Sequence, residues 1–112
     1  MTGHEFDRCV EACMRCAQEC ENCANACLQE QDVAMMAECI RLDRDCASLC
    51  WTAAALMSRG SRWAHEICRL CAEACEACAA ECRKHNEDHC QHCADACEHC
   101  AEECRKMASA HA

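Results

Sequence analysis

Residues 68–82 read CRLCAEACEACAAEC, with cysteines separated by steps of 3, 4, 3 and 4 residues. Steps of three and four residues return to one face of an α-helix. They are also the spacing of the a and d positions of a heptad, which leucine and isoleucine normally occupy in packed helices. The stretch therefore predicts a helix that turns a row of sulfur atoms towards its neighbours. Its cysteines are Cys68, Cys71, Cys75, Cys78 and Cys82.

The same spacing recurs on both sides of this stretch. Residues 9–27 carry six cysteines at steps of 4, 3, 4, 3 and 4, and residues 90–104 carry five at steps of 3, 4, 3 and 4. The recurrence predicts similar helices, each with one sulfur-bearing face. The cysteines are Cys9, Cys13, Cys16, Cys20, Cys23 and Cys27, then Cys90, Cys93, Cys97, Cys100 and Cys104.

Residues 36–57 follow the same steps of three and four residues, but cysteine occupies only three of the seven positions on this face. A buried carboxylate needs a partner, so we expect Asp43 to act as a metal ligand or to pair with Arg41 or Arg44. The residues that continue the alternation are Met36, Cys39, Asp43, Cys46, Cys50, Ala53 and Met57.

The composition favours helix along the whole chain. There is no proline, only two glycines occur, and alanine is abundant, so few residues oppose a helix. Breaks are expected at Asp32, which is typical of an N-cap, at Gly60 followed by Ser61, and at the polar stretch around Asn86. The expected helices span residues 4–29, 32–58, 62–84 and 87–108.

Helices of this length joined by short loops run antiparallel to their neighbours. We therefore predict an all-α fold, an antiparallel up-down-up-down four-helix bundle with a cysteine-lined core, as a single domain over residues 1–112. Only 18 residues are Val, Ile, Leu, Met, Phe or Trp, so thiols must fill most of the interior. A core with so little bulk also favours a homo-oligomer.

Charge and hydropathy narrow the class of protein. The net charge is −9 and the eleven basic residues are scattered, which argues against a nucleic-acid partner. No apolar run is long enough to cross a bilayer, and residues 1–10 lack the pattern of an export signal. We therefore expect a cytoplasmic chain with no membrane partner, whose 19 cysteines, an odd number, are reduced.

Reduced thiols at this density indicate a metal-binding interior. Eight Cys-x-x-x-Cys pairs occur, and Cβ atoms four residues apart on a helix lie too far apart for a disulfide. An all-thiolate site selects a soft ion, and Cu(I) is the soft monovalent ion that two thiolates can hold. Zinc knuckles and iron–sulfur motifs place cysteines in loops that this chain does not offer. We therefore predict Cu(I) as the bound metal, with multiple ions per chain.

The number of ions follows from charge. A Cu(I) ion between two thiolates leaves one net negative charge, and eight such sites would be costly to bury. Thiolates that bridge neighbouring ions bring the charge towards zero. We therefore predict a capacity well above eight ions and up to about one ion per cysteine.

The two ends of such a bundle differ. At one end, the rows of cysteines on the four helices, which we call the seams, continue to Met36, His85 and His89. We expect these three residues to act as transient ligands where copper enters. At the other end the seams extend to mainly apolar residues, which we expect to close the bundle. These are Phe6, Met57, Ala64 and Met107, with Trp63 nearby.

Three segments carry a family likeness: residues 39–46 (CIRLDRDC), 66–75 (EICRLCAEAC) and 82–93 (CRKHNEDHCQHC). They resemble the bacterial four-helix-bundle copper-storage proteins, specifically the cytosolic branch that lacks an export signal. The resemblance covers nearly the whole chain. It implies storage or sequestration of many Cu(I) ions in the cytosol and assembly as a homotetramer.

The resemblance also implies metal-site roles for His85, His89 and Asp43 near the open end. A copper chaperone or a small-molecule copper chelator is a candidate partner. One alternative function stays open, a general soft-metal sink for Zn(II), Cd(II) or Hg(II) that resembles metallothionein in role. Catalysis is not expected, because the thiols are equivalent and inward-facing and no catalytic triad or phosphate loop occurs.

Overall fold

The computed structural model describes residues 4–110 and forms a bundle of four long α-helices. The predicted helices are all confirmed, and the largest displacement of an end is five residues, at the start of the second helix. The long helices are α1 (Asp7–Cys27), α2 (Ala37–Ser58), α3 (Ala64–Cys82) and α4 (Asp88–Ser109), and two short 3-10 helices are η1 (His4–Phe6) and η2 (Val33–Met36).

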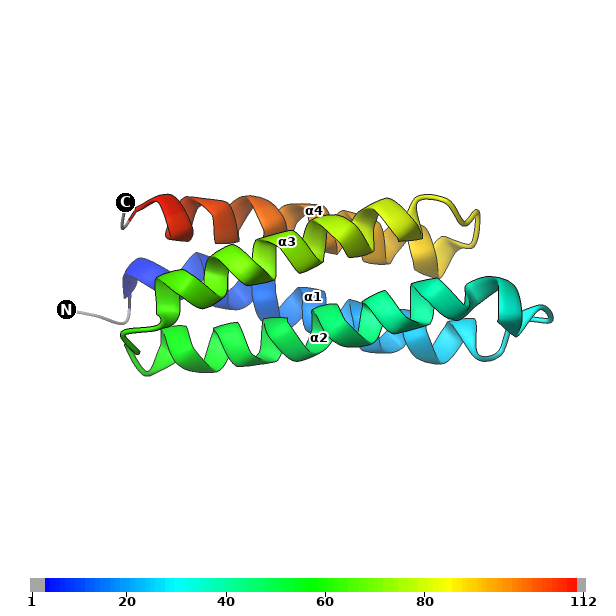
Figure 1. Cartoon of the computed structure of the whole chain (residues 1–112), viewed down its shortest axis with the longest axis horizontal. Helices are drawn as coiled ribbons and strands as arrows, with labels where there is room; N and C mark the ends of the chain where they lie inside the picture. Colours follow the sequence, from blue (N-terminus) through cyan, green and yellow to red (C-terminus); the bar gives the residue numbers. More distant parts are fainter. Residues whose placement is uncertain (1–3, 111–112) are drawn as a thin grey trace.

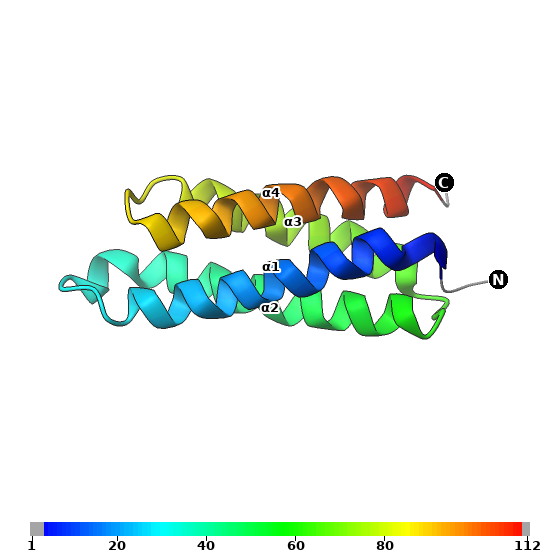
Figure 2. The ribbon, with the colours of Figure 1, turned by 180° about the vertical axis from the view of Figure 1, so that it is seen from behind.

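Successive helices run in opposite directions, and each packs beside the next, with α4 returning beside α1 (Figure 1). The bundle measures 49 × 20 × 18 Å. The start of α1, the α2–α3 turn and the end of α4 meet at one end, which we call the closed end (Figure 2). The α1–α2 and α3–α4 connections meet at the other, which we call the open end. The predicted up-down-up-down bundle is therefore confirmed.

Asp32 caps a helix as predicted, although the helix is η2 rather than α2. Its side chain accepts a hydrogen bond from the backbone N–H of Met35 at 3.3 Å. The chain then completes one 3-10 turn through Met36 before α2 begins at Ala37. This extra turn explains why α2 starts later than the capping signal indicated.

The turn between α2 and α3 requires a glycine. Gly60 has a φ of 65°, in the left-handed region that side chains disfavour. Its N–H donates to the carbonyl of Met57 at 3.1 Å, and the N–H of Ser61 donates to that of Leu56 at 2.9 Å. These two bonds form a Schellman motif, which satisfies the last carbonyls of α2. The predicted glycine stop is therefore confirmed. The Ser61 hydroxyl accepts a hydrogen bond from the N–H of Trp63 at 3.0 Å, but it caps the turn before α3 rather than the helix itself, which begins at Ala64.

Thiols and alanines fill the interior of the bundle. Every cysteine is at most 1% exposed, and alanines flank them on each helix. Among residues 4–110, the larger apolar side chains that are buried are only Phe6, Met36 and Met57. The predicted cysteine-lined core is therefore confirmed.

The outer faces of the helices are polar. Arg83 at the end of α3 bonds Asp95 at 2.6 Å and Glu98 at 2.9 Å on α4, and Arg105 bonds Glu76 at 2.8 Å. These pairs are exposed to water, so each adds little to stability. Within the described part of the chain, no helix has an apolar stretch of the length that a membrane crossing needs.

Candidate metal centre

The sulfur atoms form a column along the axis of the bundle. The seams of α1, α3 and α4 keep their predicted spacing, and α2 contributes three more cysteines between Met36 at the open end and Met57 at the closed end. All of these cysteines are free thiols. The column is therefore a set of reduced, soft donors shielded from solvent.

The shortest contacts between thiols join different helices. The sulfurs of Cys71 and Cys75, four residues apart on α3, are separated by 4.0 Å. The pairs Cys50–Cys71 and Cys16–Cys97, which join different helices, are each separated by 3.5 Å. A disulfide bond would need about 2.05 Å, whereas a metal ion that binds three sulfurs at roughly 2.3 Å holds them about 4 Å apart. The spacing thus fits metal ions shared between helices.

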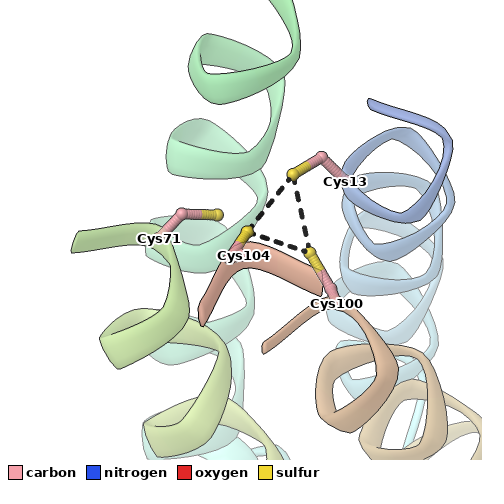
Figure 3. A group of neighbouring side chains, drawn as sticks. All are labelled: Cys13, Cys71, Cys100 and Cys104. Carbon is pink, nitrogen blue, oxygen red and sulfur yellow. Dashed lines mark hydrogen bonds between the residues drawn. The ribbon is translucent and has the colours of Figure 1, made fainter. Parts of the chain in front are cut away.

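Groups of four thiols lie along the column with all their sulfurs within 4.8 Å of one another. Figure 3 shows one of them, in which Cys13 on α1 contacts Cys100 and Cys104 on α4, and Cys71 on α3 points its sulfur towards them. The groups in the middle of the column share Cys16, Cys46, Cys20 and Cys97, as bridging between neighbouring ions requires. The other groups include Cys16, Cys46, Cys50 and Cys75; Cys16, Cys20, Cys46 and Cys97; Cys20, Cys78, Cys93 and Cys97; and Cys23, Cys27, Cys39 and Cys90.

Hydrogen bonds between thiols make the column titrate as a network. Contacts with Cys16 and Cys20 lower the pKa of Cys46. Contacts with Cys20 and Cys23 likewise lower the pKa of Cys93. The pKa of Cys20 changes in the opposite direction, because contacts with Cys16 and Cys46 raise it. The thiols therefore gain and lose protons as one coupled network rather than independently.

Asp43 places a carboxyl group inside the column. It is fully buried, and its Oδ1 accepts hydrogen bonds from Cys78 at 3.1 Å and Cys93 at 3.3 Å. Weaker contacts come from Cys82 at 3.7 Å and Cys39 at 3.9 Å. Burial, together with the nearby charge of Cys93, raises the pKa of Asp43 to about 8. The group is therefore largely protonated at neutral pH when no metal is bound.

The ion pair of Asp43 with Arg41 or Arg44, one of the two predicted arrangements, is wrong. Arg41 is exposed and pairs with Glu38 at 3.0 Å, and Arg44 is exposed on the outer side of α2. Neighbours at one and two positions on a helix point about 100° and 200° away, so neither arginine can reach an inward carboxyl. The hydrogen bonds from Cys78 and Cys93 compensate for the burial of the Asp43 carboxyl instead.

At the open end, His89 joins the column. Its Nδ1 lies 3.4 Å from the sulfur of Cys23 and 3.6 Å from that of Cys90. Its Nε2 bonds Glu30 at 2.8 Å, and the side chain is 23% exposed. When Nε2–H donates its hydrogen bond to the Glu30 carboxylate, Nδ1 carries no proton and its lone pair faces the thiols as a metal donor. His89 is therefore placed to bind an ion between solvent and the column.

The other two predicted ligands at this end, Met36 and His85, are placed differently from His89. Met36 is buried just before α2, with 2% of its surface exposed. His85 turns aside, because its Nε2 bonds Glu81 at 3.0 Å and its carbonyl accepts a hydrogen bond from Gln91 at 2.7 Å. Among the described residues, no thiol hydrogen-bonds His85. A role for His85 at the metal therefore needs a rotation of its ring.

The closed end is mainly apolar, as predicted. The ring of Phe6 is 5% exposed and packs against that of His65, with centroids 5.4 Å apart. Met57 is also fully buried, but it does more than fill space, because its Sδ accepts a hydrogen bond from the thiol of Cys68 at 3.5 Å. Trp63 is 58% exposed and does not cover this end.

Together, the fold and the site define a class of protein: a helical bundle that holds soft metal ions in its interior. The family model of the copper storage proteins matches residues 2–109. The chain therefore belongs to the copper storage protein family. Its function is storage of Cu(I), multiple ions in one cysteine-lined bundle, and it is not an enzyme.

Two proteins of known structure are similar to the chain over most of its length. Apo copper storage protein 3 from Bacillus subtilis is 50% identical, covers 92% of this chain and 98% of its own, and has a TM-score of 0.88. The Cu(I)-bound copper storage protein BsCsp3 has the same identity, covers 92% of this chain and 97% of its own, and has a TM-score of 0.89.

A cytosolic copper storage protein from Streptomyces lividans, in a structure with five coppers, is 41% identical. It covers 93% of this chain and 92% of its own, with a TM-score of 0.89. Among curated proteins, no match was found.

Proposed function

We propose that the chain, as a single Cu(I)-binding domain over residues 1–112, stores copper in the cytosol with all 19 cysteines as ligands. The observation that carries this proposal is the buried thiol column, with sulfur separations of 3.5 to 4.0 Å between and along helices. Met36, His85, His89 and Asp43 complete the proposed ligand set near the open end. The compartment is supported by the Streptomyces relative, which is described as cytosolic.

The proposed capacity rests on shared thiols. If each thiolate bridges two ions, the ratio approaches about one Cu(I) per cysteine and the buried charge approaches zero. The test is a titration of the reduced, metal-free chain with Cu(I) against a competing chromogenic chelator. We expect saturation well above eight ions, and saturation at one or two equivalents would contradict the proposal. Cys16→Ser, which alters at least two four-thiol groups, should lower the endpoint, whereas the exposed Ser48→Ala should not.

Copper enters, in this proposal, at the open end. The support is the contact of the half-buried His89 with Cys23 and Cys90, which links solvent to the column. The test replaces Met36, His85 and His89 together by Ala and follows the rate of Cu(I) uptake from a weak chelator. A matched control replaces the exposed Met35, His92 and His99. We expect slower uptake only in the first variant, and equal rates in both would count against entry at this end.

The partners are proposed from the family resemblance. A homotetramer is tested by sedimentation of the metal-free and loaded chain, and a monomer in both states would overturn it. The exposed Trp51 and Trp63 are candidate contact residues for such an assembly. A copper chaperone or a small-molecule copper chelator is the proposed exchange partner, and copper transfer between the isolated components tests it.

The alternative function is a general soft-metal sink. The four-thiol groups, with all sulfurs within 4.8 Å of one another, also suit a tetrahedral ion such as Zn(II) or Cd(II). Metal analysis of the chain isolated from cells grown without added metal separates the two functions. Copper as the dominant metal supports storage of Cu(I), and zinc as the dominant metal supports the general sink.

A further inference from the structure

The closed end of the bundle brings together four sulfur atoms, one from each helix. Cys9 on α1 contacts Cys104 on α4 at 3.7 Å, and Cys68 on α3 contacts Met57 on α2 at 3.5 Å. All four side chains are at most 1% exposed, and interactions with Cys104 and Cys9 raise the pKa of Cys68. This layer therefore contains three thiols and one thioether.

The orientation of Met57 distinguishes it from a simple apolar plug. The side chain is 0% exposed, so packing alone would be satisfied by any apolar group of this size. Its Sδ nevertheless faces a thiol, at a distance equal to the shortest thiol–thiol contacts of the column. A thioether is a soft neutral donor that suits Cu(I).

The net charge of the metal site favours a neutral donor such as the Met57 thioether at the closed end. A Cu(I) ion between two thiolates keeps one negative charge, which bridging to further ions must offset. The column ends here, so fewer neighbours can bridge. An ion held by the Cys68 thiolate and the Met57 thioether is neutral on its own, which lowers the cost of burying it. The thioether also binds without releasing a proton.

We propose that Met57 is a Cu(I) ligand, and that with Cys68, Cys9 and Cys104 it forms a mixed thioether–thiolate site that ends the column at the closed end. This inference rests on the proposed storage of Cu(I) in the thiol column and adds a ligand that is not a cysteine. It assigns a metal role to a residue whose position alone predicted only packing.

The direct test measures copper next to selenium in selenomethionine-labelled protein. Met57→Leu keeps an apolar side chain of similar volume and removes the donor, and the control Met14→Leu removes a methionine that is 47% exposed on α1. Each variant then carries five labelled methionines out of six. After full loading with Cu(I), selenium-edge X-ray absorption should show a Se–Cu shell at about 2.4 Å that is stronger in Met14→Leu than in Met57→Leu.

Equal Se–Cu shells in the two variants would overturn the proposal. If Met57→Leu does not fold, the labelled double variant Met36→Leu/Met107→Leu decides, since Met57 is then the one methionine of the described residues that is buried or partly buried. A Se–Cu shell in that variant supports the site, and no shell refutes it. If the storage proposal itself fails, even the unsubstituted chain will not take up many ions, so the two failures are distinguishable.

Discussion

Replacing Asp43 by asparagine should remove a specific pH dependence from the stability of the metal-free bundle. In the folded chain, burial among Cys78, Cys93, Cys82 and Cys39 raises the pKa of this carboxyl from 3.8 to about 8. The unfolded chain exposes the carboxyl to water, where its pKa returns to the ordinary value. Between these two values, the folded state holds a proton that the unfolded state has released.

The sign and size of the effect follow from this difference. The unfolded state binds fewer protons between pH 4 and pH 8, so the free energy of unfolding falls as the pH rises. One proton corresponds to about 1.4 kcal/mol per pH unit, or about 3 kcal/mol between pH 5 and pH 7. Below pH 4 and above pH 8 the carboxyl has the same charge in both states, so its contribution to the slope disappears.

The assay is denaturant unfolding followed by circular dichroism, at pH 5, 6, 7 and 8, with a reductant and a metal chelator present. The asparagine amide of the Asp43→Asn variant does not titrate, so the difference between the two curves reports Asp43 together with the thiols that are coupled to it. We expect the unsubstituted chain to lose stability faster than Asp43→Asn as the pH rises. Parallel curves would refute the argument that the buried carboxyl stays protonated.

Three further predictions concern the core and the turns. The copper-loaded chain should unfold at a higher temperature than the metal-free chain, because ions bind the folded column, and identical midpoints would contradict this. Gly60→Ala should lower the free energy of unfolding by about 1 kcal/mol, since alanine disfavours a φ of 65°, whereas Ser58→Ala should have little effect. Ala53→Cys, at a fully buried seam position of α2, should raise the Cu(I) endpoint by about one ion; an unchanged endpoint would show that its thiol does not join the column.

The helices and their inward faces were predictable because their signals are local. A step of three or four residues defines a helix face without reference to any other segment. Cys68, in the second turn of α3, and Cys82, at its end, therefore lie on one buried face as predicted. Gly60 and Asp32 also act through hydrogen bonds to residues within five positions of themselves, so their roles were readable from neighbouring residues.

The two histidines of the open end could not be told apart from the local sequence. His85 and His89 are equally polar and lie four residues apart, yet only His89 contacts thiols. The difference comes from the path of the α3–α4 connection, which places His89 in the first turn of α4 and leaves His85 before it. That path depends on how α4 packs against α1, a contact that joins distant parts of the chain.

What the sequence alone determined is therefore the set of inward-facing donors: the helical cysteine seams and the choice of a soft metal. Tertiary structure decided which donors meet. The contact of Asp43 with Cys93, the contact of Met57 with Cys68, and the cross-helix groups of thiols all depend on the axial position of one helix relative to another. Periodicity within a helix carries no information about that position, because loops and side-chain packing set it.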